Sequence, residues 1–171
     1  MVAMLLRSLI TAFFTGLFLL SASICPAWAA PPPTMTITGQ AGVWTSSSLL
    51  PGEQFPLDID LTTRADAVTF EFAPITVGPA RISLRRSGSG EYDPATGALR
   101  LDAPLLISVA GTRLSTDLTL STTGSYTLPQ GDVLRGVPVD GQGRLLLTGA
   151  MTVPAGLFSI KAWFAVSGVL S

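Results

Sequence analysis

The chain closes on GLFSIKAWFAVSGVLS, residues Gly156 to Ser171. Its apolar side chains recur at every second position: Phe158, Ile160, Ala162, Phe164 and Val166. A period of two puts alternate side chains on opposite faces of a β-strand, whereas an α-helix repeats every 3.6 residues. The charge of Lys161, in the middle of the stretch, also argues against a membrane-spanning helix. The stretch therefore predicts a long strand with one face toward a core.

The same alternation runs through most of the chain. Between residues 55 and 61, for example, four apolar residues are separated by Pro56, Asp58 and Asp60. No stretch has a convincing helical period, so we predict an all-β chain. Strands are expected at about 34–38, 55–61, 67–73, 80–86, 98–102, 104–110, 113–120, 144–153 and 157–169, with a further short strand at 125–128.

Two hairpins can be aligned by matching their apolar residues. Gly111 indicates a two-residue turn of type II′ between Ala110 and Arg113, which sets Val109 opposite Leu114.

The C-terminal hairpin has a four-residue connection, Pro154 to Leu157. We expect this connection to place Gly149 opposite Ala162, with Phe158 and Phe164 buried.

Many short strands separated by turns predict a sandwich or a small barrel. We favour an antiparallel β-sandwich of about nine strands, because the connections rich in glycine and proline differ in length. A small closed or partly open β-barrel is the alternative. An outer-membrane barrel is disfavoured, since such barrels carry aromatic girdles and this chain has few aromatic residues. Turns at Asp93–Gly97 and Asp140–Gly143 resemble each other, which either hairpin chemistry or an internal duplication explains.

The N-terminus has the layout of a cleavable signal peptide. Arg7 precedes an apolar run from Leu9 to Leu20, and small residues lead to Ala27-Trp28-Ala29, an A-x-A cleavage site. We therefore expect a signal peptide at 1–29, a proline-rich spacer at 30–33 and a single all-β domain at 34–171. The expected location is extracytoplasmic: the periplasm, the cell surface or the medium. No later hydrophobic run is long enough for a transmembrane helix.

Composition excludes several chemistries. The chain has no histidine, and its one cysteine, Cys25, falls in the predicted signal peptide, so the mature chain is free of cysteine. Imidazole and thiolate catalysis are therefore unavailable. Once Arg7 is removed, 9 of the 10 basic residues and all 11 acidic residues remain, which does not suggest nucleic-acid binding. No phosphate-binding loop is recognisable, and we expect no cofactor.

Two groups of charged residues are candidate sites. Asp58 and Asp60 share one face of a strand, and Glu71 on a neighbouring strand completes a set of oxygen ligands that could hold calcium. Because the spacing matches no calcium loop, a solvated strand face is the favoured interpretation, and we predict no metal site.

A second candidate is a ligand or anion face formed by Arg81, Arg85 and Trp163. Arg100 and Arg113 are expected close to it. An ordinary charged surface is the simpler interpretation.

The favoured function is a non-enzymatic, secreted or periplasmic module with a structural or binding role. The partner is unknown, and a cell-surface or envelope component fits the predicted location. One alternative is a small barrel that carries an apolar ligand, which requires a large apolar cavity. Another is a carbohydrate-binding or carbohydrate-active protein that uses its carboxylates with Trp44 or Trp163, which requires an exposed aromatic ring beside an acid.

Overall fold

The computed structural model describes residues 33–46, 53–64, 67–155 and 158–171. The predicted signal peptide lies outside these residues, as does the spacer except for Pro33. The described residues form β-strands and no helix, as the alternation predicted. No helix among them could cross a membrane. The strands are β1 (Thr34–Thr45), β2 (Glu53–Arg64), β3 (Ala67–Phe72), β4 (Ile75–Val77), β5 (Ala80–Leu84), β6 (Gly88–Asp93), β7 (Ala98–Val109), β8 (Thr112–Ser121), β9 (Ser125–Thr127), β10 (Val133–Arg135), β11 (Arg144–Ala155) and β12 (Phe158–Leu170).

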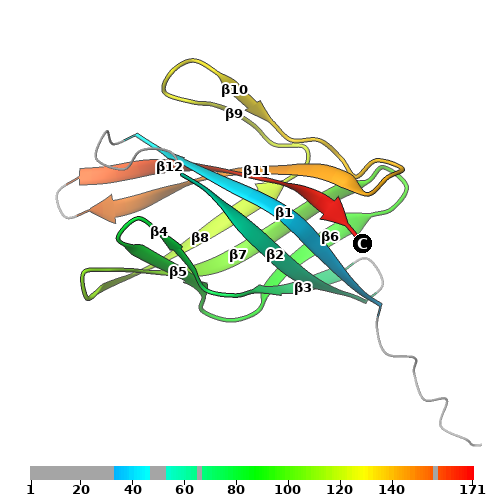
Figure 1. The fold of residues 1–171 in the computed structure, drawn as a ribbon, viewed down its shortest axis with the longest axis horizontal. Helices are drawn as coiled ribbons and strands as arrows, with labels where there is room; N and C mark the ends of the chain where they lie inside the picture. Colours follow the sequence, from blue (N-terminus) through cyan, green and yellow to red (C-terminus); the bar gives the residue numbers. More distant parts are fainter. Residues whose placement is uncertain (1–32, 47–52, 65–66, 156–157) are drawn as a thin grey trace, which may run out of the picture. The chain divides into compact units, whose positions relative to one another are not determined.

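The main sheet closes into a barrel, so the sandwich prediction is wrong and its barrel alternative is right. Eight antiparallel strands follow one another around the barrel in the order β7-β6-β3-β2-β1-β12-β11-β8 (Figure 1). The hairpin of β7 and β8 completes the ring, because β8 pairs with β7 on one side and with β11 on the other. Alternation with a period of two is the same in a sandwich and in a barrel, so it does not distinguish them.

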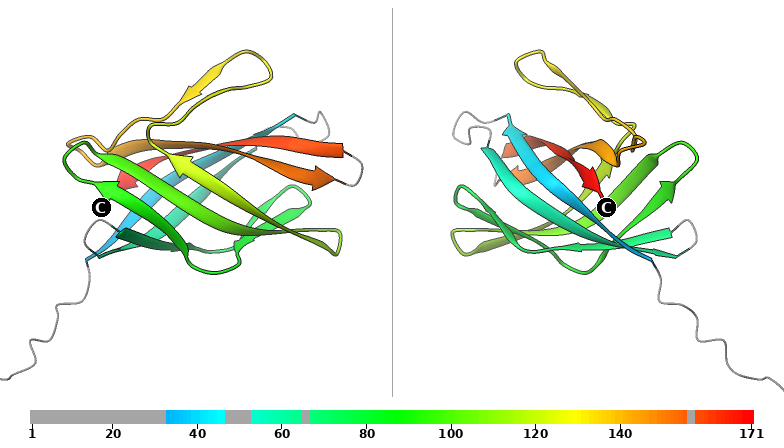
Figure 2. Two further views of the ribbon diagram at one scale, coloured as in Figure 1. Left: turned by 180° about the vertical axis from the view of Figure 1, so that it is seen from behind. Right: turned by 45° about the vertical axis from the view of Figure 1, so that its right-hand side comes forward.

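The barrel is fully paired at one end and loosely joined at the other. β8 and β11 are paired only through Thr148–Ser121 and Gly149–Leu120. The first half of β2 pairs with β1, but among the described residues it has no ladder to β4. There the N–H of Gly78 donates to the Glu53 carboxylate at 2.9 Å and links the β4–β5 hairpin to β2. The splayed end therefore has two facing layers, as a sandwich does (Figure 2).

Buried apolar side chains from seven of the eight barrel strands fill the interior, and β6 adds the partly buried Tyr92. Ile37, Ile59, Leu101 and Leu147 are almost completely buried there. Glycine permits a close approach between β6 and β3: a Cβ at Gly88 would collide with the buried ring of Phe70 on β3. β6 therefore lies tightly against β3, although its sequence has little apolar surface of its own.

β12 is buried on both faces along part of its length, which one-sided alternation did not predict. Phe164 points into the barrel, while Trp163 and Ala165, on the outer face, are also at most 8% exposed. The β9–β10 hairpin, which we call the arm (Ser125–Arg135), lies over the outside of the barrel beside β11 (Figures 1 and 2). A bridge between Val137, two residues beyond the arm, and Leu146 connects the chain there to β11.

Both predicted hairpin registers are wrong by two residues, yet each keeps the right faces inward. The first turn is Ala110-Gly111, with φ of 47° and 83°, which is a type I′ turn instead of type II′. Val109 accordingly lies opposite Thr112, and Ile107, not Val109, lies opposite Leu114.

In the C-terminal hairpin, Gly149 lies opposite Phe164, and Met151 takes Ala162 as its partner. Phe164 is buried, as predicted. The side chain of Phe158 and the connection at 156–157 lie outside the described residues. A slip of two residues returns each side chain to the same face, so matching of apolar faces could not detect it.

The two similar Asp turns share two features, although the first, closed by Gly97 N–H to the Asp93 carbonyl, is one residue longer than the second, closed by Gly143 N–H to the Asp140 carbonyl. The Asp93 carboxylate accepts a hydrogen bond from the N–H of Ala95 at 2.9 Å, and the Asp140 carboxylate accepts one from the N–H of Gln142 at 2.8 Å. Gly97 and Gly143 each close the turn at a positive φ, of 69° and 77°. Turn chemistry accounts for the sequence similarity without a duplication.

Candidate functional site

The outward side chains of β3, β6, β7 and β8 form a continuous polar surface, which we call the polar face. The strand registers arrange it in two rows. The rows are Ala67–Glu91–Arg100–Ser121 and Thr69–Ser89–Asp102–Thr119. Residues directly opposite in an antiparallel pair project from the same face, so each row runs straight across four strands.

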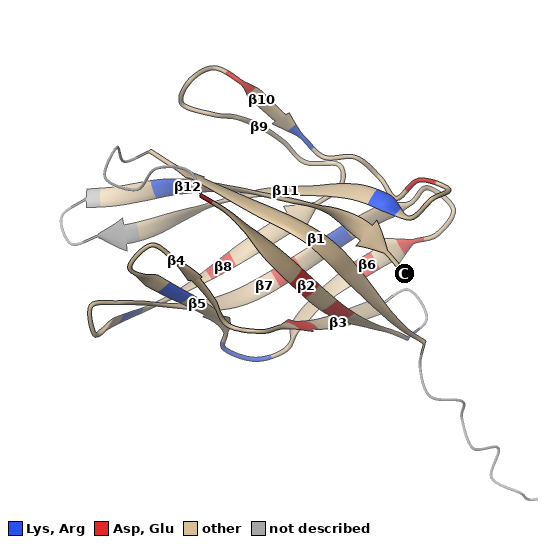
Figure 3. Ribbon diagram, viewed as in Figure 1, with Lys and Arg blue, Asp and Glu red and all other residues tan. Residues whose placement is uncertain are grey.

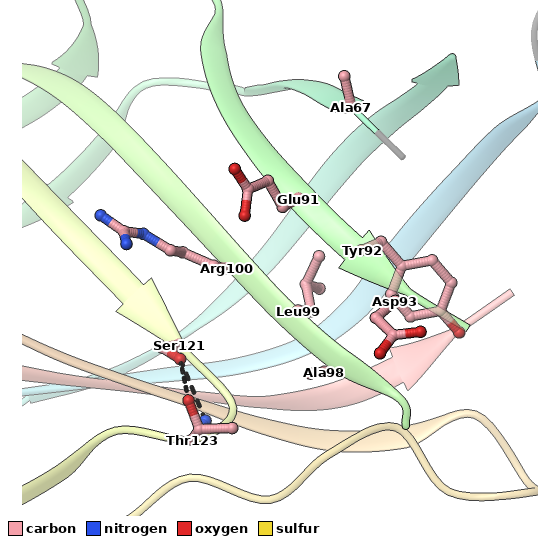
Figure 4. A pocket seen from close by; sticks show the side chains of 9 residues that line it. All are labelled: Ala67, Glu91, Tyr92, Asp93, Ala98, Leu99, Arg100, Ser121 and Thr123. Atoms are coloured by element: carbon pink, nitrogen blue, oxygen red, sulfur yellow. Dashed lines mark hydrogen bonds between the residues drawn. The ribbon is translucent and has the colours of Figure 1, made fainter. Parts of the chain in front are cut away.

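The larger hollow on this face is a groove of about 590 Å³ over β6, β7 and the end of β8. Glu91 and Arg100 lie opposite each other on its floor, and Ser121 and Thr123 stand beyond them (Figure 4). The Ser121 and Thr123 hydroxyls are 2.9 Å apart and hydrogen-bonded. The groove thus offers two carboxylates, a guanidinium and hydroxyl groups, because Asp93 and Tyr92 line it as well.

A second groove, of about 450 Å³, adjoins the first along the same strands. The Asp102 carboxylate lines it, accepting a hydrogen bond from Thr119 Oγ1 at 2.5 Å and one from the Arg100 guanidinium at 3.3 Å. These bonds hold Asp102 in place beside Ser89, which lies opposite it on β6. Both grooves therefore expose positively and negatively charged side chains, together with hydroxyl groups, that can form hydrogen bonds with a ligand.

One carboxylate of the larger groove, Asp93, is held by its own turn. The pKa of Asp93, which lines the larger groove, is lowered by hydrogen bonds from the Thr96 hydroxyl and from the Ala95 N–H. That carboxylate is ionised at neutral pH and belongs to the turn, so it is unsuited to donating a proton.

The predicted acidic set is only partly brought together. Asp60 lies directly opposite Glu71, and the Thr36 and Ser87 hydroxyls donate to these two carboxylates at 3.1 and 2.7 Å. Asp58 lies opposite Thr38, on β1 and not on β3. Within the described part of the chain, no three acidic residues are grouped to hold a metal ion.

The predicted anion face is divided between two sides of the barrel. Arg81 is on β5 and Arg85 just after it, where Arg85 forms an ion pair with Asp117 at 2.8 Å. Trp163 is on β12, separated from β5 by β7, β8 and β11. Its ring is buried, and it lies opposite Trp44. Trp163 is therefore not part of a surface with the arginines.

Among the described residues, the interior cavity of the barrel is too small for a ligand. Its cavity has a volume of about 40 Å³ and is lined only by apolar side chains, among them Phe55, Phe72, Ile75 and Phe164. Pockets that bind small molecules are usually about 300–1,000 Å³. The interior is therefore a packed core in this conformation.

The polar face was missed by the sequence interpretation because β6, Gly88–Asp93, was not recognised as a strand. Its sequence, GSGEYD, has no apolar alternation, and glycines take the inward positions. The available signal was the series of serine, threonine and charged residues on the outward positions of the strands around it.

Comparison with known proteins finds no family model, curated protein or solved structure that matches the chain. The geometry itself defines the class: a small antiparallel barrel with an apolar interior and a polar, grooved exterior.

Proposed function

We propose that the protein is an exported, non-catalytic binding module whose binding surface is the polar face. The observation that carries the proposal is the contrast between a filled interior and two large grooves on the exterior. The polar face supplies hydrogen-bond donors and acceptors held by neighbouring strands. Such groups suit a hydrophilic ligand or a polar patch on an envelope partner.

Two properties of the sequence support export and the absence of catalysis. The three-part N-terminus with its A-x-A site is typical of a secretory signal. The absence of histidine and of a cysteine beyond residue 25 removes the most common catalytic bases and nucleophiles. We expect mass spectrometry of the exported protein to find Ala30 at its N-terminus. An intact N-terminus would contradict export by cleavage.

The binding surface can be tested by filling a groove. Ser89 is exposed on β6, so Ser89→Trp should block the smaller groove without disturbing the core. A fragment screen read by protein NMR should give shifts concentrated on β6–β8, and Ser89→Trp should abolish those of the fragments that bind this groove. Ser167→Trp, at an exposed position on β12, is the matched control. Fragments that shift mainly interior residues, or that bind Ser89→Trp unchanged, would contradict the proposal.

A second candidate, carriage of an apolar ligand, is favoured by the unpaired boundary between β2 and β4. Phe55 on β2 and Ile75 on β4 are half-buried there, and both line the small cavity. Separation of the two strands would enlarge that cavity. Titration with an apolar fluorescent probe, N-phenyl-1-naphthylamine, distinguishes the functions: saturable uptake by the folded protein supports the carrier, and its absence supports the binding module.

A further inference from the structure

A row of guanidiniums and hydroxyls crosses the outside of the splayed end of the barrel. Arg81 on β5 lies opposite Thr76 on β4 and opposite Ser108 on β7, and Ser108 in turn lies opposite Arg113 on β8. The row is therefore Thr76–Arg81–Ser108–Arg113. It points outward, because the adjoining residue Ile82 is buried inside the barrel.

The two arginines of this row carry uncompensated charge. Both are exposed, and among the described residues neither guanidinium forms a hydrogen bond or an ion pair. Arg85, just after β5, is paired with Asp117, and Arg100 on β7 with Asp102. Arg86, next to Arg85, has no ion pair among the described residues, but it lies outside the row. Blue segments accordingly lie close together on β5 and at the β7–β8 turn in Figure 3.

Two acidic groups on this part of the barrel already accept hydrogen bonds from other groups. Asp117 lies four residues along β8 from Arg113 and accepts from Arg85 at 2.8 Å. Glu53 accepts from the N–H of Gly78 at the tip of the β4–β5 hairpin, 2.9 Å away. Arg81 is not explained as protection of a free sheet edge, since β5 is paired on both sides. Arg113 is paired on one side, with β7, because β8 meets β11 only at Leu120 and Ser121.

The spacing of the row fits one oxyanion. Neighbouring strands are about 4.8 Å apart, so the Cα atoms of Arg81 and Arg113 are about 10 Å apart with Ser108 midway. Guanidiniums on long side chains can converge from that separation on a group placed above the serine hydroxyl. Each guanidinium presents a planar fork that binds two oxygens of a phosphate, and the hydroxyl adds a third donor.

We propose that Arg81, Ser108 and Arg113 form a binding site for a phosphate monoester group. A phosphate monoester carries about −1.5 to −2 charges at neutral pH, which matches the two guanidiniums. The site lies at the splayed end, apart from the polar face. The group is borne either by a free ion or by a lipid headgroup such as that of phosphatidic acid.

The first experiment titrates the full-length mature protein with inorganic phosphate at constant ionic strength and follows the Nε–H signals of arginine by NMR. The signals of Arg81 and Arg113 should shift together and saturate. Arg81→Gln and Arg113→Gln should each weaken binding by at least about tenfold, the effect of losing charge-assisted hydrogen bonds. Arg81→Lys keeps the charge but loses the fork, so it should also weaken binding.

The matched control is Arg135→Gln, which removes the same charge from an exposed position on the arm. It should change the dissociation constant less than about twofold. If all three glutamine variants weaken binding equally, the attraction comes from net charge, and the proposal is wrong. Unchanged thermal midpoints would show that the exposed substitutions leave the fold intact.

The second experiment identifies the source of the phosphate. Vesicles of phosphatidylcholine with and without phosphatidic acid are sedimented with wild-type protein, Arg81→Gln and Arg135→Gln. Binding that requires phosphatidic acid and Arg81, without saturable binding of inorganic phosphate, assigns the site to a lipid headgroup. Binding of inorganic phosphate that requires both arginines assigns it to a soluble phosphate. If neither probe binds in a manner that requires Arg81 and Arg113, the proposal is overturned.

Discussion

Gly149 of β11 lies directly opposite Phe164 of β12, at the point where the barrel closes. On its other side Gly149 pairs with Leu120 of β8, one of only two residue pairs that join β11 to β8. A Cβ on Gly149 would collide with the carbonyl oxygen of Thr119. The closure therefore depends on a strand that lacks a side chain at the point of contact.

Gly149→Ala should loosen this closure. The added methyl group must displace backbone atoms of β8, so we expect a loss of about 1–3 kcal/mol in the free energy of unfolding. Urea denaturation measures the loss. Gly141→Ala is the control, because a Cβ there would meet no atom and its φ is not positive. Equal stabilities of the two variants would show that the close approach is not required.

Phe164→Ala tests the burial of the other partner. The ring is 7% exposed inside the barrel, and its removal should cost about 3–5 kcal/mol through lost burial and a new cavity. Ser167→Ala, at an exposed position of the same strand, should change stability by less than about 0.5 kcal/mol. Denaturation curves of both variants check the prediction. A Phe164→Ala protein as stable as Ser167→Ala would place the ring outside the core.

The strand pattern could be predicted where side chains alternate, and it could not where glycine replaces them. The alternation from residue 55 to 61 and in the C-terminal strand identified β2 and β12, because burial of one face requires apolar residues at every second position. β6 has glycine on its inner face, and the ring of Phe70 supplies the apolar surface there. Such a strand forms because it pairs with neighbouring strands, and its own sequence carries no apolar alternation by which to recognise it.

Neither the closure of the barrel nor the candidate site could be predicted from the sequence, because both depend on which strands are neighbours. The choice between sandwich and barrel depends on whether β8 reaches β11, which happens over two residue pairs far apart in sequence. The structure does not group Arg81, Arg85 and Trp163 on one surface. The alternation of a sequence shows which residues share a face of one strand, but it does not show the order of the strands in the sheet. The row of Arg81 and Arg113 became visible only once β5, β7 and β8 were aligned.

The two Asp turns should make stability depend on pH. Hydrogen bonds, chiefly from the Thr96 hydroxyl, lower the pKa of Asp93. Hydrogen bonds, chiefly from the Arg144 side chain, lower the pKa of Asp140. Because both values are below those of the unfolded chain, the contribution is present above about pH 4 and is lost as the pH falls through the folded-state values. The urea midpoint should therefore decline in acid.

The double variant Asp93→Asn/Asp140→Asn should show a shallower decline. Asparagine still accepts the turn hydrogen bonds through its carbonyl oxygen but does not titrate. Asp58→Asn/Asp132→Asn is the control, since these exposed carboxylates accept no hydrogen bond within the described structure. An acid dependence identical in the two double variants would mean that the turns are not its source.

Calcium should not stabilise the protein. Asp60 and Glu71 are close but accept hydrogen bonds from hydroxyl groups, and Asp58 faces β1. The thermal midpoint should be the same in a chelator and in millimolar calcium, because only a ligand that binds the folded state raises it. A rise of several degrees that disappears in Asp60→Asn would establish a calcium site.

Loss of the buried hydroxyl of Thr122 should lower the stability of the protein more than loss of the buried hydroxyl of Thr148. Both side chains are fully buried. Thr122 follows the end of β8, and its Oγ1 accepts a hydrogen bond from the Leu99 N–H at 2.9 Å, in place of a further backbone pair. Thr148 Oγ1 only donates, at 3.3 Å, to the Ser121 carbonyl oxygen.

Valine preserves the shape of threonine, so each Thr→Val change isolates the hydroxyl. Thr122→Val leaves a buried N–H at Leu99 without its side-chain partner and should cost about 1–3 kcal/mol. Thr148→Val removes only a donor to a carbonyl oxygen and should cost about 1 kcal/mol less. Hydrogen exchange of the Leu99 amide gives the specific readout: its protection should fall in Thr122→Val and persist in Thr148→Val. Equal unfolding energies together with unchanged Leu99 exchange would show that the Thr122 hydroxyl does not satisfy this N–H.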